Sequence, residues 1–371
     1  MNAHHTQFLE VFRDASRGNV KTPQSEFLEW GEVPVVDQGQ DLIAGYVNDR
    51  SRVCNVDLPV IVFGDHTRVF KYVDFEFAMG ADGTKILAPI RGDDPKYLFH
   101  ALRALHLPAA GYSRHYKFLK RTEIPLPPLA EQKRIAKILD AADALRAKRR
   151  ESLALLDELL RSAFLDLFGD PVTNPRGWDR RSVGELATKV TKGTTPTTLG
   201  LQFAEAGIPF VRVQNLVDGK VDHSRDSLWI DEMTHSALER SIIRDGDILV
   251  SIAGTIGRVA LVEGAREMNC NQAVAIVRLG HSISRVYFLH WMQTEDAQRQ
   301  MKKKGVKGTI TNLSLTQIKS MNVPVVDPRI AERFEATAGR IAKLREQQLG
   351  HLRELDNLFA SLQSRAFRGE L

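Results

Sequence analysis

The chain has 371 residues, 43% of them hydrophobic and 26% charged, which excludes collagen-like, wholly disordered and disulfide-scaffold proteins. Its length exceeds that of one ordinary domain, so we expect two or more domains. Lys and Arg outnumber Asp and Glu by 51 to 46, and the net charge of +5 is a mild indication of a polyanionic partner.

The N-terminal sequence MNAHHTQFLEVFRD lacks the apolar core of a signal peptide, and no apolar run approaches the roughly 18 residues of a membrane span. We therefore expect a cytoplasmic protein that has no membrane partner. Cys54 and Cys270 have neither a CxxC motif nor a nearby Cys/His pair. This spacing argues against a metal site and a disulfide framework, so both cysteines are expected to be small buried residues.

Residues 1–124 form the first predicted domain. They are rich in β-branched residues and glycine, and short apolar or alternating runs predict strands at VPVV (33–36), VIVF (60–63) and KYVDFEF (71–77). We expect a globular α+β domain that contains a twisted sheet.

Residues 125–169 predict a long helix. Ile135, Ile138, Ala142 and Leu145 recur at alternating spacings of three and four, as in a coiled coil. No proline interrupts residues 130–168, and the glycine at position 169 stands where a C-terminal cap belongs. A helix of this length spans roughly 55 Å and needs a partner along its apolar stripe.

Residues 170–323 form a second predicted α+β domain, with strand-like runs IPFVRV, DILVSIAG and VAIVRL. It is faintly similar to the first: Val33-Pro34 matches Ile208-Pro209, and Tyr97 matches Tyr287. The separation between matches grows from 175 to 199 positions along the chain, so the second domain has 24 more residues in its loops. The two domains are expected to share a scaffold and to differ in their loops.

Residues 324–371 repeat the first long helix. The positions that match at a separation of 199 include Pro125 and Pro324, Arg134 and Arg333, Leu145 and Leu344, Arg146 and Arg345, and Asp157 and Asp356. A later match, of Ala163-Phe164 with Ala366-Phe367, predicts four extra residues in the second helix. Equal stripes joined through a folded domain can return antiparallel, so we expect the two helices to pair. The predicted core of the pair is Ile135, Ile138, Leu145, Leu153, Leu156, Ile341, Leu344, Leu352 and Leu355.

The chain contains no recognisable catalytic motif. Its only Pro-Pro pair lies in LPPL before the first long helix, a helix-entry signal and not the Asn/Asp-Pro-Pro-Tyr/Phe loop of amino-methyltransferases. No G-x-x-x-x-G-K-[ST] run is present to cradle phosphates. Glu131 and Lys133 have the spacing of a nuclease site, but they lie in a first helical turn without a suitable Asp upstream. We therefore expect a non-enzymatic protein with no catalytic residues, no metal and no cofactor of its own.

Polar clusters at loop-like positions are candidates for DNA contacts, because cations suit phosphates and amides, hydroxyls or aromatic rings suit base edges. The candidate DNA-binding residues are Arg68, Tyr112, Ser113, Arg114, Tyr116, Lys117, Arg212, Gln214, Asn215, Arg258, Asn271, Gln272, Lys302, Lys303, Lys304, Lys307, Thr309 and Asn312. Alternatives stay open: the run at 112–117 also fits a solvated strand edge, the lysines fit a solvated helix end, and amides also cap turns. Arg68 and Arg258 follow turns at similar places in the two domains.

Several segments carry a family resemblance. They are VPVVDQGQDLIAGY (33–46), VIVFGDHTRVFKYVDFEFAMGADGTKIL (60–87) and GYSRHYKFLKRTEIPLPPLAEQKRIAKIL (111–139), and more loosely GIPFVRVQNL, GDILVSIAGTIGRVALV and GVKGTITNLSLTQIKSMNVPVV. Over nearly its whole length the chain resembles the specificity subunit of type I restriction-modification systems. The second helix departs from the pattern, with VVDPRIAERF where the first has PPLAEQKRI.

The resemblance implies two target-recognition domains, at 1–124 and 170–323, which alternate with spacer helices at 125–169 and 324–371. It implies antiparallel helices, with the recognition domains at opposite ends about a pseudo-twofold axis. The implied partners are double-stranded DNA with a bipartite asymmetric target, two methyltransferase subunits and, through them, restriction/translocase subunits. S-adenosylmethionine, ATP and Mg would be bound by those partners. The alternatives are the equivalent subunit of a type IIB-like system and, in a different class, a coiled-coil scaffold that does not bind DNA.

Overall fold

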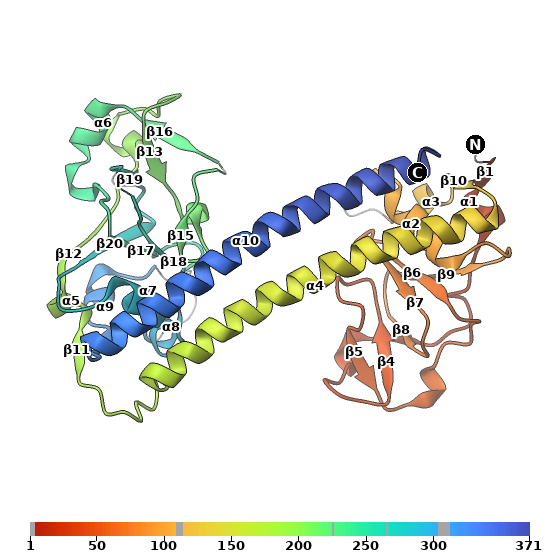
Figure 1. Cartoon of the computed structure of the whole chain (residues 1–371), viewed down its shortest axis with the longest axis horizontal. Helices are drawn as coiled ribbons and strands as arrows, with labels where there is room; N and C mark the ends of the chain where they lie inside the picture. The colour runs from red at the N-terminus through yellow and green to blue at the C-terminus, as the bar shows by residue number, and fades with distance from the viewer. Residues whose placement is uncertain (1–3, 109–113, 225, 265, 303–311) are drawn as a thin grey trace. The chain divides into compact units, whose positions relative to one another are not determined.

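The computed structural model describes residues 4–108, 114–224, 226–264, 266–302 and 312–371. The chain divides into two compact units, coloured along the sequence in Figure 1. Unit 1 comprises residues 1–152 and 348–371, and unit 2 comprises residues 153–347. Each unit therefore holds one globular domain and part of each of two long helices.

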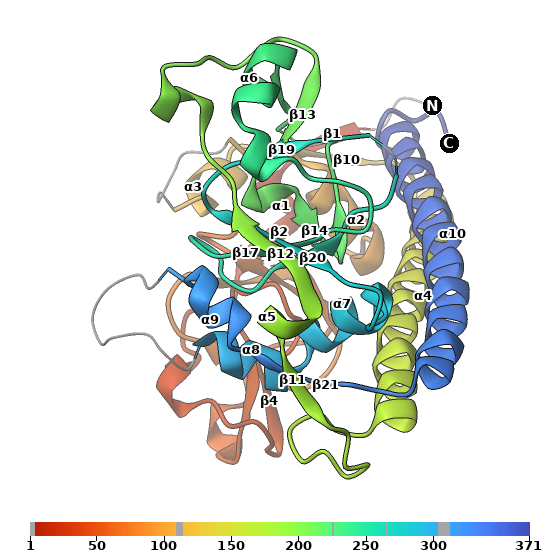
Figure 2. The same ribbon diagram turned by 90° about the vertical axis from the view of Figure 1, so that its left-hand side faces the viewer.

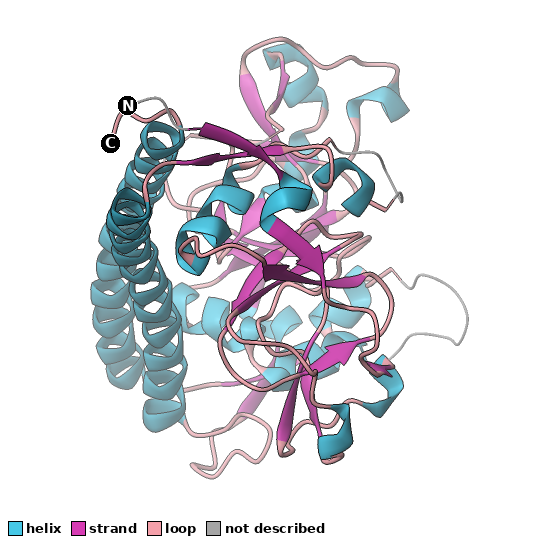
Figure 3. Cartoon of the chain, turned by 90° about the vertical axis from the view of Figure 1, so that its right-hand side faces the viewer, coloured by secondary structure: helices cyan, strands magenta, loops and turns pink. Residues whose placement is uncertain are grey.

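The domain of unit 1 contains two four-stranded sheets (Figure 3). The first is antiparallel, in the order β2 (Phe12–Asp14), β9 (Thr84–Pro89), β6 (Val60–Gly64) and β7 (Phe70–Val73). The second has the order β3 (Lys21–Thr22), β8 (Ala78–Gly80), β4 (Val33–Val36) and β5 (Gly45–Val47). A ribbon pairs β1 (His4–Gln7) with β10 (Glu123–Leu126), and the short helices are α1 (Phe8–Val11), α2 (Pro95–Ala104) and α3 (Tyr116–Leu119).

The domain of unit 2 is built in the same way (Figure 2). Its antiparallel sheet has the order β12 (Ala187–Lys192), β20 (Val274–Leu279), β17 (Ile248–Ser251) and β18 (Val259–Leu261). A second sheet has the order β16 (Leu228–Ile230), β13 (Ile208–Val211) and β19 (Asn269–Cys270). Two-stranded ribbons pair β11 (Arg180–Ser182) with β21 (Asn322–Pro324) and β14 (Leu216–Val217) with β15 (Lys220–Val221). The helices are α5 (Val183–Leu186), α6 (Glu232–Ala237), α7 (Arg285–Gln293), α8 (Glu295–Lys302) and α9 (Leu315–Lys319).

The predicted repeat of the two domains is confirmed by strands that pair in the same way in both. β4 pairs antiparallel with β5 and parallel with β8, and β13 pairs in the same two ways with β16 and β19. The first residues of β4 and β13 are Val33 and Ile208, the positions that the sequence comparison had matched. The most buried strand of each main sheet, β6 or β17, is a continuous apolar run, because both of its faces are covered. The strand predicted over 71–77 ends earlier, at Val73, because the chain then moves to the second sheet.

Two tyrosines dock equivalent helices on both domains. Tyr97 of α2 donates its hydroxyl to the carbonyl of Pro125 at 2.6 Å, and Tyr287 of α7 donates to the carbonyl of Pro324 at 2.9 Å. Both side chains are almost fully buried, and burial raises the pKa of each phenol, so both donate as neutral hydroxyls.

The long helices are α4 (Leu129–Phe168) and α10 (Pro328–Phe367), each of 40 residues (Figure 1). Gly169, with φ of 77°, follows α4 and donates its N–H to the carbonyl of Leu165, as the predicted cap requires. The first residues of the two helices are 199 positions apart, and so are their last residues. The prediction that the second helix has four extra residues is therefore wrong. The structural counterpart of Phe367 is Phe168: their rings lie 5.7 Å from Tyr97 and 4.7 Å from Tyr287, respectively.

The helices run antiparallel within each unit, and one ion pair occurs twice. In unit 1, Arg146 of α4 donates to Asp356 of α10 at 2.6 Å. In unit 2, Arg345 of α10 donates to Asp157 of α4 at 3.0 Å. Adding 199 to the position of Arg146 gives Arg345, and adding 199 to the position of Asp157 gives Asp356, so the two units contain equivalent pairs in which α4 and α10 exchange roles.

The predicted core of the helix pair is correct in part. Ile135 and Ile341 are buried, at 2% and 5% exposure, but Leu145 and Leu344 are 55% and 46% exposed, so these two assignments are wrong. One residue further on, Arg146 and Arg345 lie at the contact between the helices, and successive residues point about 100° apart around a helix. The other members of the predicted core are partly buried: Ile138, Leu153, Leu156, Leu352 and Leu355.

The ends of the long helices belong to the cores of the domains. Ile135, Leu139 and Phe359 pack with the buried residues of α2 and β6 in unit 1. Phe164, Phe168 and Phe334 pack with Tyr287 in unit 2, where the ring centroids lie 4.7 to 5.7 Å apart. Burial of these apolar and aromatic side chains in the domain cores replaces the longer apolar seam that an isolated coiled coil would need.

Both cysteines are buried and free, as expected, and burial raises the pKa of the Cys54 thiol to about 11. Among the residues that the structure describes, none of the helices combines the length and the apolar character of a membrane span.

Replacing a buried residue of α10 should destabilise unit 2 far more than replacing an exposed one. Ile341→Asp places an unpaired carboxylate in the core and should lower the free energy of unfolding by several kcal/mol. Leu344→Asp, three residues away and 46% exposed, should change it by about 0.5 kcal/mol or less. Urea unfolding of both variants measures the difference, and equal losses would contradict the observed orientation of α10.

His290 should make unit 2 less stable in mild acid. Burial lowers its pKa to about 4, against the opposing effect of a hydrogen bond with Gln293, and its ring lies edge-on to Phe334. The neutral form is therefore favoured in the folded state, and its stabilisation is complete above the unfolded pKa of about 6.5 and is lost as the pH falls towards 4. The loss at pH 5 should be roughly 2 kcal/mol. Unfolding of the wild type and of His290→Phe at pH 7 and pH 5 tests this, and an equal pH dependence in both proteins would contradict it.

Candidate nucleic-acid interface

Four predicted segments of unit 2 lie side by side, although they are far apart in the sequence. The N–H of Asn271 donates to the carbonyl of Val211 at 3.2 Å, and the N–H of Ile252 donates to that of Ala273 at 2.8 Å. The N–H of Leu313 then donates to the carbonyl of Ile252 at 2.8 Å. These bonds join residues 212–215, 252–258, 271–273 and 312–313 into one surface, which we call the second strip.

Unit 1 has an equivalent surface. Asp65, after β6, donates its N–H to the carbonyl of Gly83 at 2.6 Å and accepts at its own carbonyl from the N–H of His115 at 2.9 Å. The Asp65 carboxylate also accepts from the N–H of Tyr116 at 2.6 Å. We call residues 37–38, 65–68, 81–83 and 114–117 the first strip. Its bonds from 65 to 83 and from 115 to 65 correspond to those from 252 to 273 and from 313 to 252 in unit 2.

Most of the predicted DNA-binding residues that the structure describes are accessible. Arg68, Arg114, Lys117, Gln214, Arg258, Gln272, Lys302 and Asn312 are exposed, and Tyr116, Arg212 and Asn271 are partly buried. Tyr112, Ser113, Lys303, Lys304, Lys307 and Thr309 lie outside the described residues. Arg68 lies in the turn of the β6–β7 hairpin, and Arg258 lies in the turn of the equivalent β17–β18 hairpin.

Asn215 is a structural residue, so its assignment to DNA binding is wrong. It is 1% exposed, its Oδ1 accepts from the N–H of Arg212 at 2.9 Å, and its Nδ2 donates to the carbonyl of Asp222 at 3.0 Å. Both polar ends of the amide are used in closing the turn after β13, which is the alternative role that amides have in turns.

Tyr116 contributes packing and holds cations at the surface. Its ring contacts Phe8 edge-on at 6.2 Å, and the Nζ atoms of Lys85 and Lys120 lie 5.0 and 5.5 Å from the ring centroid. Burial raises the pKa of this phenol to about 12. The sequence run around Arg114 is therefore a mixture of exposed cations and a packed aromatic ring, not a uniform strand edge.

Other predicted side chains are oriented by local bonds. Arg212 donates to the backbone carbonyl of Asp226 at 2.7 Å, and the side-chain Oδ1 of Asn271 accepts from the N–H of Ala273 at 3.2 Å. The side chain of Gln272 accepts from the hydroxyl of Thr195. Thr195 was not predicted, and its only sequence signal is the threonine-rich segment that follows β12.

The two strips differ in charge. The second strip contains Arg212 and Arg258 and no Asp or Glu, whereas the first combines Arg68, Arg114 and Lys117 with three aspartates, at positions 37, 65 and 82. Sequence reasoning missed the residues at 37–38 and 81–83, which only their pairing with residues 65–68 identifies. Equivalent scaffolds therefore present different chemistry.

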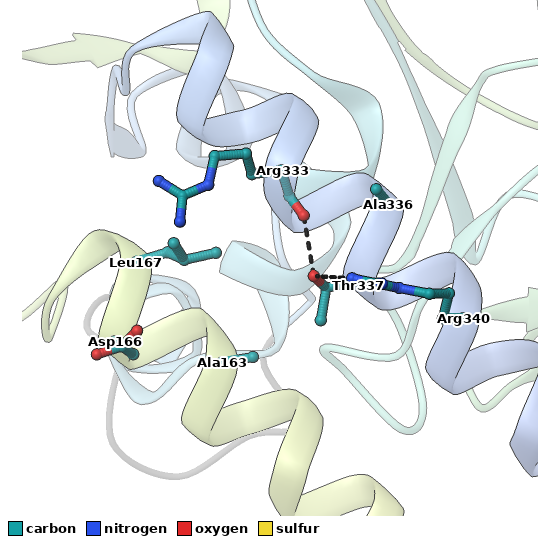
Figure 4. A pocket seen from close by; sticks show the side chains of 7 residues that line it. All are labelled: Ala163, Asp166, Leu167, Arg333, Ala336, Thr337 and Arg340. Carbon is teal, nitrogen blue, oxygen red and sulfur yellow. Dashed lines mark hydrogen bonds between the residues drawn. The ribbon is translucent and has the colours of Figure 1, made fainter.

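No metal centre is found in the described part of the chain, because no group of three or more His, Cys, Asp or Glu there could hold an ion. A hollow of about 380 Å³ lies in unit 2 between α4 and α10 (Figure 4). Its residues are Ala163, Asp166, Leu167, Arg333, Ala336, Thr337 and Arg340. Thr337 donates to the carbonyl of Arg333 at 3.0 Å and accepts from Arg340 at 3.3 Å, so the hollow has two guanidinium groups on its α10 side.

The model of one protein family, the type I restriction modification DNA specificity domain, matches the chain twice, over residues 11–155 and 175–349. The chain belongs to this family. The chain is 28% identical over 288 residues to the Escherichia coli type I restriction enzyme EcoBI specificity subunit, and the match covers 68% of this chain and 59% of that one. It is 24% identical over 355 residues to the E. coli EcoR124I/EcoR124II specificity subunit, covering 87% of this chain and 86% of that one.

Solved structures show the same fold. A type I restriction-modification S subunit from M. genitalium superposes with a TM-score of 0.61 at 15% identity, over 99% of this chain and 96% of that one. A chain from a study of complex assembly and conformational transition of the type I R-M system superposes with a TM-score of 0.54 at 19% identity, over 100% and 98% of the two chains. These likenesses confirm the predicted α+β architecture with two long helices.

The helix α8 contacts the second strip, because Gln298 donates to the carbonyl of Gly257 at 3.0 Å. Removing the exposed cation at the end of this helix should weaken duplex DNA binding without changing its sequence preference. Lys302→Ala at the end of α8 should flatten the slope of log affinity against log salt by up to about 0.9, the value for one lost phosphate contact. Lys343→Ala makes the same change of charge at an exposed residue of α10, which is not part of the strip, and serves as the control. Binding titrations at several salt concentrations decide the matter, and equal slopes in the two variants would remove Lys302 from the interface.

Proposed function

We propose that this protein is the specificity subunit of a type I restriction-modification complex and binds double-stranded DNA at a bipartite asymmetric target, of which each unit reads one half. The observation that carries this proposal is the duplicated scaffold, in which matched backbone bonds assemble two strips that carry unlike side chains. A shared scaffold with unlike reading surfaces suits two half-sites of different sequence, because base identity is read by side chains at base edges.

The proposed role is recognition without catalysis. Neither strip carries a nucleophile paired with a base or a phosphate-binding glycine loop, and the described residues lack a metal-ligand cluster. Methylation, translocation and cleavage would be carried out by partner subunits, which would bind S-adenosylmethionine, ATP and Mg. The chain itself would need no cofactor.

The long helices are the proposed docking surface for methyltransferase subunits. In unit 1, Leu145 and Leu358 are 55% and 49% exposed, and in unit 2 the residues related by 199 positions, Leu344 and Leu159, are 46% and 53% exposed. Exposed leucines at equivalent positions suit two copies of one methyltransferase subunit. Restriction/translocase subunits would join the complex through these methyltransferase subunits. The Arg333 and Arg340 hollow in unit 2 suits an acidic side chain of such a partner.

Exchange of one domain tests the recognition of half-sites. Replacing residues 170–323 with the corresponding domain of another specificity subunit should change one half of the target and leave the other half and the gap between them unaltered. Single-molecule methylation mapping in cells that also express the modification partners reads the motif directly. The matched control exchanges residues 1–124, which should change the other half. A single exchange that changes both halves would contradict recognition by independent units.

A further inference from the structure

The segment after β4 occupies in unit 1 the place that Arg212 occupies in unit 2. β4 and β13 are equivalent strands, and they end at Val36 and Val211. Residues 37–41 (DQGQD) therefore begin the loop that corresponds to residues 212–215 of the second strip. These five residues include two aspartates and two glutamines and no Lys or Arg, which distinguishes them from the rest of the first strip.

Gln38 ties this loop to the β6–β7 turn, which carries Arg68. Its carbonyl accepts from the hydroxyl of Thr67 at 2.5 Å, and its side-chain Oε1 accepts from the N–H of His66 at 3.3 Å. Backbone and side chain of one residue thus fix the turn in one orientation. Gly83, whose φ is +80°, leaves room for this contact, because a Cβ there would lie 2.5 Å from Oε1 of Gln38.

A buried lysine supports the base of the loop. Lys71 of β7 has a side chain only 4% exposed, and its Nζ lies 3.4 Å from Oδ1 of Asp37. The same oxygen accepts from the N–H of Gly39 at 2.8 Å. Gly80 packs against the loop from β8, where a Cβ would lie 2.4 Å from Cβ of Asp37. A desolvated ion pair and a close glycine contact hold the start of the loop, and a lysine so buried cannot reach a phosphate.

The last two residues of the segment 37–41 are accessible to a ligand. Gln40 and Asp41 are exposed, while residues 37–39 are partly buried. An amide can make paired hydrogen bonds with adenine, and a carboxylate accepts from the amino group of cytosine. Two aspartates repel phosphates, so this loop suits base edges in the major groove, whereas Arg68, Arg114 and Lys117 supply the nearby positive charge.

We propose that residues 37–41 are a base-reading loop of the first recognition domain, in which Gln40 contacts a base edge and Gln38, Asp37 and Lys71 are positioning residues. The assignment rests on the proposed function, since it presupposes sequence-specific binding of duplex DNA. It adds a reading segment that the sequence run at 112–117 did not include.

Selection from randomised duplexes by the full-length chain, followed by fluorescence anisotropy on the selected duplex and its single-base-pair variants, tests the reading role. Gln40→Ala should reduce discrimination at one base pair of the first half-site by about ten-fold or more, without changing the second half-site or the salt slope. Gln24→Ala, which removes an exposed amide elsewhere in unit 1, should leave discrimination unchanged. Equal discrimination in the Gln40→Ala and Gln24→Ala variants would overturn the reading role.

Lys71→Met tests the positioning role, because it retains the length of the side chain and removes the ion pair. It should relax discrimination at the same base pair as Gln40→Ala, measured at a temperature where circular dichroism reports a folded protein. A lower melting temperature with unchanged sequence preference would overturn positioning by Lys71, and a changed salt slope would mean a phosphate contact instead. If the wild type selects no sequence, the proposed function fails; if it does and Gln40→Ala preserves the preference, only the loop assignment fails.

Discussion

Burial of aromatic side chains at the helix ends is the constraint on which the remaining structure depends. The seam between α4 and α10 is narrow, with arginines at two of its positions and leucines turned to solvent beside them. Such a pair would gain little from its own contacts, because helix stability in proteins comes mainly from packing of an apolar face. Phe164, Phe168 and Phe334 supply that packing in unit 2, and Phe359 contributes to it in unit 1. Each domain core is therefore completed by residues of both long helices, and helix and domain are not separable modules.

The cross-helix ion pairs contribute register more than stability. Arg146 packs over the ring of Phe359 at 4.4 Å while it donates to Asp356, so its position is determined by packing as well as by charge. Asp356 is 41% exposed and Asp157 is 58% exposed, and ion pairs of this kind are worth about 0 to 1 kcal/mol. Their occurrence at both equivalent places nevertheless selects one antiparallel alignment, since a slip of one residue would separate both pairs.

The first and second strips show a similar division between a constant backbone frame and variable side chains. Backbone bonds such as those of Asp65 with Gly83 and of Ile252 with Ala273 hold the strips together in both units, and backbone bonds do not depend on side-chain identity. The side chains on the same segments are free to differ, and they do: one strip is mixed in charge and the other has no carboxylate. A frame of this kind allows the exposed side chains of the strips to change without loss of the fold.

The sequence by itself determined the repeat, the α+β class, the two long helices and the burial of both cysteines, because periodicity, strand-like apolar runs and capping residues are local signals. It also placed the exposed cations at Arg68 and Arg258 in equivalent turns. Which face of each helix is buried was decided by tertiary structure: the stripe predicted Leu145 inside, but domain contacts turn the buried face towards Arg146. The role of Asn215 was likewise decided by the turn that surrounds it, and the meeting of residues 37–38 with 65–68 by sheet pairing. These outcomes depend on contacts between segments far apart in the chain, which no local pattern of residues encodes.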